Sequence, residues 1–203
     1  MRVRSAGDAA LLVETGDLST THRFRAALER AALPGVTDIV PGACTVLVAA
    51  DPDRADMDRL AQRLRDLPLA ATEESAPPPL EVPVVYDGED LDEVAGLVGR
   101  SVDEIVARHT GSEHVVAFLG FSPGFGYLSG LDPSLHVPRR PSPRTRVPAG
   151  SVGVAGPYSC VYPSATPGGW RLIGRTDLRV WHPGREPPAL FQPGRPVRFV
   201  AAA

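Results

Sequence analysis

The chain of 203 residues contains no lysine, so all 21 of its basic residues are arginine. A Schiff-base lysine, a lysine nucleophile and a lysine-containing phosphate loop are therefore excluded. Its two cysteines are too few for a disulfide framework. No apolar run approaches the roughly 20 residues of a membrane-spanning helix, and the first apolar stretch stops at Glu14, too early for a secretory signal. We expect a cytoplasmic protein with no membrane partner.

Charge is unevenly distributed along the chain. The net charge is −3, but residues 81–113 carry 2 arginines against 9 acidic residues, and residues 114–203 carry 10 arginines against 3. Two interpretations are open: an acidic helical surface beside a basic domain, or a basic segment that binds an anion. Nucleic acid is not an expected partner, because the chain is acidic overall and shows no helix-turn-helix or RNA-recognition pattern. With 43% hydrophobic residues the chain forms a globular core.

The first part of the chain reads as a small ferredoxin-like α+β domain, in which strands and two helices alternate. Helical spacing predicts one helix over Leu18–Leu33, capped by Ser19 or Thr20, and a second helix capped by Asp51. The strands expected around them are Arg2–Ser5, Ala9–Glu14, Val36–Val40 and Cys44–Ala49, the last two forming a hairpin.

Three consecutive prolines mark a linker before the second domain. We expect a first domain over 1–72, a linker over 73–79 and a second domain over 80–203. The second domain begins with a strand and two short helices, expected at Leu80–Tyr86, Leu91–Val98 and Val102–His109, and Ser101 caps the last of these. From His114 onward, short strands alternate with Gly- and Pro-rich turns, which predicts an antiparallel β-barrel.

Aromatic residues and glycines alternate after the strand that begins at His114. Strict alternation along this strand places His114, Val116 and Phe118 on one face, and the residues from Ser122 to Phe125 fit a type II turn. This segment is either a barrel corner with its aromatic side chains packed inward or a loop that approaches a ligand. The candidate ligand-binding residues here are His114, Phe121, Ser122, Phe125 and Tyr127.

Four arginines follow within the eleven residues Pro138–Pro148. Prolines restrain this loop, and guanidinium groups bind carboxylate or phosphate through paired hydrogen bonds. Arg144 is the first candidate for such a clamp and Arg140 the second. Further along, Tyr162 and Trp170 form either a ligand wall or part of the core. We find no catalytic triad and no metal-ligand spacing, so these residues favour an anion-binding β-domain over a self-sufficient enzyme.

Together these segments resemble the carboxyltransferase-like family that includes allophanate hydrolase subunit 1, the kinase inhibitor KipI and bacterial 5-oxoprolinase subunits. The resemblance is strong after residue 80 and weaker before it. One departure is local: relatives often have Gln-Thr-Gly where this chain has Tyr158-Ser-Cys160. The residues that carry the resemblance are Gly120–Leu128, Pro138–Arg140, Pro143-Arg144, Val147–Gly153, Tyr162-Pro163, Thr166–Trp170 and Leu172–Gly174.

The resemblance implies an α+β domain followed by a cyclophilin-like β-barrel. It also implies one component of a multi-subunit hydrolase that uses ATP to open 5-oxo-L-proline to glutamate, and that is inactive alone. Its partners are then a C-type subunit similar to allophanate hydrolase subunit 2 and an A-type subunit of the LamB/YcsF kind, and ATP is handled by the complex. The alternatives are a KipI-like inhibitor that binds a sensor histidine kinase, and a component of an allophanate hydrolase or urea carboxylase system.

Overall fold

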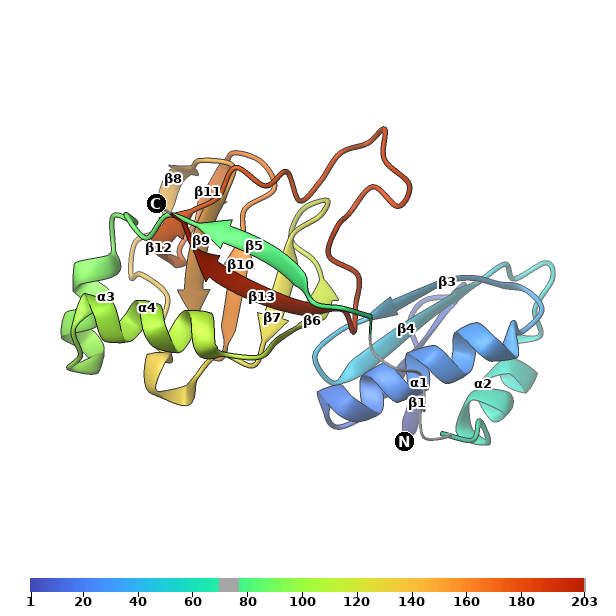
Figure 1. Cartoon of the computed structure of the whole chain (residues 1–203). Coiled ribbons are helices and arrows are strands. Elements are labelled where there is room, and N and C mark those ends of the chain that lie inside the picture. The colour runs from blue at the N-terminus through green and yellow to red at the C-terminus, as the bar shows by residue number, and fades with distance from the viewer. Residues whose placement is uncertain (70–76, 203) are drawn as a thin grey trace. The chain divides into compact units, whose positions relative to one another are not determined.

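The computed structural model describes residues 1–69 and 77–202. The chain divides into two compact units, Met1–Ser75 and Ala76–Ala203 (Figure 1). Each unit has its own hydrophobic core. The domain boundaries expected from the sequence stay a prediction, because residues 73–76 of the expected linker lie outside the described residues. No helix in the described ranges is long and apolar enough to cross a bilayer.

The first unit is a four-stranded antiparallel sheet with two helices on one face. The strand order is β1-β2-β4-β3. Alternate strand residues such as Val13 and Val46 are fully buried against Phe24 of α1 and Leu64 of α2. The order is that of the ferredoxin-like layer, with β1 in the place of the last strand. The elements are β1 (Arg2–Ser5), β2 (Ala10–Glu14), α1 (Leu18–Ala31), β3 (Val36–Pro41), β4 (Thr45–Ala50) and α2 (Met57–Arg65).

Both helices of this unit are capped by an aspartate other than the residues expected. The N-cap of α1 is Asp17, whose carboxylate accepts the N–H of Thr20 at 2.8 Å. The N-cap of α2 is Asp56, not Asp51, so this helix begins later than expected. The carboxylate of Asp51 instead accepts the N–H of Asp53 and stabilises the turn before the helix.

The second unit contains the other helices and a barrel-like sheet. Ser101 caps α4 in a full capping box with Glu104, as predicted. The elements are β5 (Leu80–Val84), α3 (Leu91–Val98), α4 (Val102–Gly111), β6 (His114–Leu119), β7 (Gly126–Ser129), a 3₁₀ turn (Pro133–Leu135), β8 (Arg144–Val147), β9 (Ser151–Ala155), β10 (Tyr158–Val161), β11 (Thr166–Gly168), β12 (Arg171–Arg175) and β13 (Pro196–Ala201).

Seven of these strands close into a barrel. Their order is β12-β9-β10-β7-β6-β13-β5, and the two edge strands meet where Val85 and Arg175 exchange two backbone hydrogen bonds of 2.9 Å. The β5–β13 pair is parallel and the other pairs in this sheet are antiparallel. The predicted fold class, an α+β domain followed by a β-barrel, is confirmed.

The barrel strands pack on both faces. Each of the seven strands contributes residues to an inner core, which also includes Val94 of α3 and Ile105 of α4. Figure 1 shows these helices beside each other, below β5 and β13. A second, smaller core lies on the opposite face of the strands and is centred on Phe125, Tyr162 and Trp170, next to the β8–β11 pair.

One expectation for β6 is wrong. The sequence alternation placed Phe118 on the same face as His114 and Val116, but the β6–β7 register shifts between Val116 and Phe118. This irregularity moves Phe118 to the outer face, where its ring stacks on Tyr127 at 4.4 Å, while Val116 stays in the inner core. The strand is apolar at every position from Val115 to Leu119, so the sequence pattern alone did not reveal the shift.

Candidate functional site

Five of the predicted site residues converge in one aromatic cluster on the outer face of the barrel. The ring of Phe125 makes edge-to-face contacts with Phe121, Tyr127, Tyr162 and Trp170, at centroid separations between 5.2 and 5.8 Å. Phe125, Tyr162 and Trp170 are buried and Tyr127 is half-buried. Phe121 is 63% exposed. The cluster therefore runs from the protein interior to the surface at Phe121.

The loop between β6 and β7 holds Phe121 in an unfavourable backbone conformation. Its φ is +68°, in the left-handed region that bulky residues rarely adopt. Gly124, in the same loop, has φ +78°, and a Cβ there would lie 2.6 Å from the Cβ of Trp181, so both conformation and space require glycine. Phe125 donates its N–H to the carbonyl of Ser122 at 3.0 Å, which closes the predicted turn. Backbone strain of this kind is often found at binding sites.

The two arginines predicted to clamp an anion bind one buried carboxylate instead. Asp90, only 2% exposed, accepts two hydrogen bonds of 2.8 Å from Arg144 and one of 2.6 Å from Arg140. The backbone N–H of Leu172 donates a fourth bond, at 2.7 Å. Glu89 also pairs with Arg144, at 3.1 Å. This network joins the start of α3 to β8 and β12.

Charge pairing dominates the ionisation of this network. Burial alone would raise the pKa of Asp90, but the hydrogen bonds from Arg144 and Leu172, with the charges of Arg144 and Arg140, outweigh it and lower the pKa. The hydrogen bond to Asp90 raises the pKa of Arg144 in turn. Asp90 therefore stays ionised, and its charge is matched within the protein. Arg140 and Arg144 remain predicted site residues, but in this structure their guanidinium groups serve the network.

His114 lies in a different network, with helix α4. Ser159 Oγ is 3.1 Å from Nε2 of His114 and 3.0 Å from Nε2 of His109, and all three residues are buried. Nδ1 of His109 is 2.7 Å from the hydroxyl of Tyr86, and Nδ1 of His114 is 3.2 Å from the carbonyl of Ser112. Ser159 and Cys160 are neighbours on β10, so their side chains point to opposite faces of the strand. The buried histidine chain, which includes Ser159, therefore lies on the opposite face from the aromatic cluster.

When both histidines are neutral, a single arrangement of hydrogens satisfies every hydrogen bond of the buried histidine chain. The Ser112 carbonyl only accepts, so His114 carries its hydrogen on Nδ1 and accepts the Ser159 hydroxyl on Nε2. Ser159 then accepts from His109 Nε2, and His109 Nδ1 accepts from Tyr86. Burial lowers the pKa of His114 to about 4. Burial, together with the neighbouring His114 ring, also lowers the pKa of His109 well below its usual value. Both rings are therefore neutral at pH 7.

The structure thus assigns the nine predicted residues to three places. The aromatic five form the outer cluster, Arg140 and Arg144 join Asp90, and His114 joins the buried histidine chain. Ser122 lies in the cluster's loop, with a buried hydroxyl that has no hydrogen-bond partner. Sequence reasoning missed Asp90, although the acidic segment 81–113 and the basic segment 114–203 carried the signal. It also missed Ser159 and His109, which no local pattern links.

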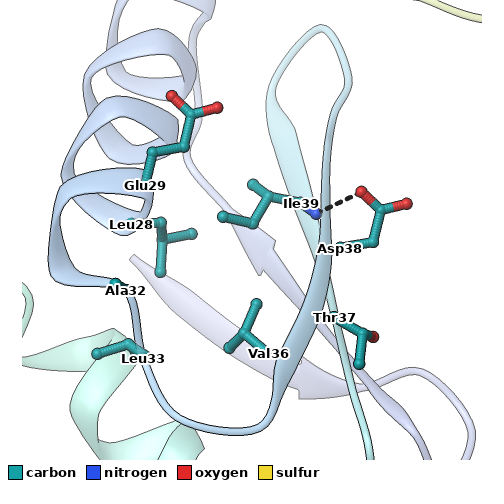
Figure 2. A pocket seen from close by; sticks show the side chains of 8 residues that line it. All are labelled: Leu28, Glu29, Ala32, Leu33, Val36, Thr37, Asp38 and Ile39. Carbon is teal, nitrogen blue, oxygen red and sulfur yellow. Dashed lines mark hydrogen bonds between the residues drawn. The ribbon is translucent and has the colours of Figure 1, made fainter.

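An open groove of about 440 Å³ lies in the first unit, between the end of α1 and β3 (Figure 2). It contains no cationic residue and no predicted site residue. Glu29 pairs with Arg25, and Asp38 accepts the N–H of Ile39, so neither carboxylate needs a ligand. The residues that line it are Leu28, Glu29, Ala32, Leu33, Val36, Thr37, Asp38 and Ile39. This groove does not fit an anion.

Among residues 1–69 and 77–202, no three His, Cys, Asp or Glu side chains lie close enough to hold a metal ion. Both cysteines are free thiols, Cys44 exposed and Cys160 buried. Burial raises the pKa of the Cys160 thiol well above its usual value, so this sulfur is held as an unreactive thiol in the outer core.

Comparison with characterised proteins identifies close relatives. The chain is 44% identical over 172 residues to the B subunit of 5-oxoprolinase from Escherichia coli O157:H7, which covers 83% of this chain and 79% of the relative. It is 35% identical over 222 residues to the protein of the same name in Bacillus subtilis (strain 168), covering 98% of this chain and 92% of the relative.

Solved structures share the fold of this chain. The structure of TTHA0988 in space group P212121 superimposes with a TM-score of 0.85 at 39% identity, and this chain spans 41% of its length. The urea amidolyase of K. lactis shares the fold alone, with a TM-score of 0.78 at 22% identity over 99% of this chain and 15% of that one. The family model "Carboxyltransferase domain, subdomain C and D" matches residues 1–191. The chain therefore belongs to the carboxyltransferase domain family, subdomains C and D.

Proposed function

We propose that this chain is the B subunit of an ATP-dependent 5-oxoprolinase, which opens 5-oxo-L-proline to L-glutamate. The observation that carries the proposal is the identity of 35% to 44% to proteins that bear this name, which in one case extends over 98% of this chain. In the reaction, the oxygen of water bonds to the ring carbonyl carbon, the ring C–N bond breaks and the nitrogen takes up a proton. Hydrolysis of ATP drives this step.

The chain acts with partners in this proposal. Two buried polar networks of this chain are already paired internally, because Asp90 is matched by Arg140 and Arg144 and the neutral histidines bind Ser159. This arrangement favours a protein that contributes part of a site. The partners are a C-type subunit similar to allophanate hydrolase subunit 2 and an A-type subunit of the LamB/YcsF kind, all in the cytoplasm. ATP is bound by the complex, because this chain has no lysine for a phosphate loop.

Deletion of the gene in its source organism tests this function. We expect the deletion strain to lose growth on 5-oxoproline as sole nitrogen source, to keep growth on glutamate, and to regain the first when the gene is supplied on a plasmid. The rescue uses the organism's own partner subunits, so mismatched partners are not a concern. Unchanged consumption of 5-oxoproline by the deletion strain would contradict the proposal.

A further inference from the structure

The substrate of the proposed reaction carries a carboxylate, and the two arginines expected to bind it are already occupied. Asp90 accepts hydrogen bonds from both Arg140 and Arg144 and is almost fully buried. An incoming carboxylate would have to displace the Asp90 carboxylate, which also accepts a hydrogen bond from the backbone N–H of Leu172. Arg140 and Arg144 are therefore not free to bind a substrate carboxylate.

Arg139 is the neighbouring cation that the Asp90 network leaves out. It is exposed, and among the described residues no carboxylate lies within ion-pair distance of it. Its guanidinium carbon lies 5.8 Å from the centroid of the Trp170 ring, in the range of a cation–π contact. A guanidinium over an aromatic ring keeps its N–H edge available, and that edge matches the two oxygens of a carboxylate.

The backbone on both sides of Arg139 is fixed to Gly169 and Arg171, the two residues that flank Trp170 between β11 and the start of β12. The N–H of Arg140 donates to the carbonyl of Gly169 at 2.8 Å, and Nε of Arg171 donates to the carbonyl of Pro138 at 3.1 Å. These two contacts bracket Arg139 and hold its backbone beside Trp170. A restrained guanidinium loses less conformational entropy when it binds an anion than a freely moving one does.

The ring beneath Arg139 is rigid. Trp170 is 4% exposed and contacts the rings of Phe125 and Tyr127, at 5.8 and 5.6 Å. Phe125 in turn contacts the exposed, strained Phe121. Arg139 is thus an exposed cation at the edge of a mostly buried aromatic cluster, where a carboxylate can reach it from solvent.

We propose that Arg139, held over Trp170, binds the carboxylate of the cyclic amide substrate, and that Arg140 and Arg144 hold the structure around it. The inference rests on the proposed function and adds the residue that selects a substrate with a negative charge. The ammonium group of lysine presents no planar pair of donors, so a lysine at this position replaces the charge but not the geometry.

The test uses the complex reconstituted from this chain and its partner subunits. We expect Arg139→Ala to raise the KM for 5-oxoproline about 10- to 150-fold, the loss of one charge-assisted pair, with kcat changed by less than about threefold. Arg139→Lys gives a smaller rise. Arg146→Ala is the matched control, because Arg146 is an exposed arginine of the same loop and lies outside the ion pairs of the described residues.

A neutral analogue separates binding from a structural effect. The carboxamide of 5-oxoproline lacks the charge, so the wild-type complex should prefer the acid, and Arg139→Ala should remove most of that preference. Equal preference in wild type and variant, or an equal KM rise in the Arg139 and Arg146 variants, would overturn the inference while the wild-type complex still cleaves 5-oxoproline. A wild-type complex that leaves 5-oxoproline intact would overturn the proposed function itself.

Discussion

The buried histidine chain makes the second unit sensitive to mild acid. His114 is 1% exposed and its pKa is lowered to about 4, while an unfolded histidine has a pKa near 6.5. In the unfolded state His114 therefore binds a proton below about pH 6.5, whereas in the folded state it binds that proton only below about pH 4. The free energy of unfolding has its full contribution from neutral His114 above about pH 6.5, and it decreases as the pH falls from about 6.5 toward 4. The pKa of His109 is lowered as well, so its protonation in the unfolded state adds to the loss of stability in acid.

The size of the effect follows from the shift. Each pH unit below the unfolded pKa costs about 1.4 kcal/mol, so His114 alone removes about 2 kcal/mol between pH 7.5 and pH 5. With an m-value of about 2 kcal/mol per molar urea, the unfolding midpoint falls by about 1 M. Most carboxylates titrate below this window, which separates their contribution from that of the histidines.

Urea titrations followed by tryptophan fluorescence measure this loss. Both tryptophans, Trp170 and Trp181, lie in the second unit, so the signal reports that unit. We expect His114→Gln to be less stable than wild type at pH 7.5 and to lose about 2 kcal/mol less between pH 7.5 and pH 5. The control is His182→Gln, since His182 is exposed. Parallel pH dependence in wild type and His114→Gln would refute the reasoning.

Two further predictions concern the Asp90 network and the loop between β6 and β7. Asp90→Asn leaves Arg140 and Arg144 without their matched charge and should destabilise the second unit by about 3 to 5 kcal/mol in urea titrations. Glu89→Gln is the control, because this side chain is 71% exposed, and it should cost less than about 1 kcal/mol. Equal costs would contradict the assignment of Asp90 as the centre of the network. Gly124→Ala places a Cβ against Trp181 at positive φ, and should lower the thermal midpoint more than Gly96→Ala, where a Cβ meets no atom; a Gly124 variant as stable as the Gly96 variant would contradict the geometry of the loop.

Local patterns predicted most of the elements correctly. The capping box at Ser101, the turn at Ser122 and the hairpin of β3 and β4 each depend on neighbouring residues. The face of Phe118 was wrong, because the register shift that moves it depends on pairing with β7. The caps of α1 and α2 were misassigned because several polar residues near each start have similar capping propensity, and the turn geometry decides among them.

The candidate site was predicted in composition but not in connectivity. The aromatic residues were found because glycines and aromatics alternate over one short segment, and four arginines stood together in another. Their partners come from far along the chain: Asp90 lies more than fifty positions before Arg144 and Ser159 lies 50 after His109. The charge asymmetry between the segments 81–113 and 114–203 indicates that acids and arginines pair, but it does not say which carboxylate pairs with which arginine. The prediction that Arg144 binds substrate therefore had no means of accounting for Asp90.

The most direct test of the account is an omission experiment with purified proteins. This chain, its C-type partner and its LamB/YcsF-type partner are mixed with ATP and 5-oxoproline, and glutamate and ADP are measured together. We predict that glutamate forms only when all three proteins are present, that its formation stops when this chain is left out, and that this chain alone forms none. Glutamate formation at an equal rate without this chain, or by this chain alone, would contradict its role as an essential component of the complex.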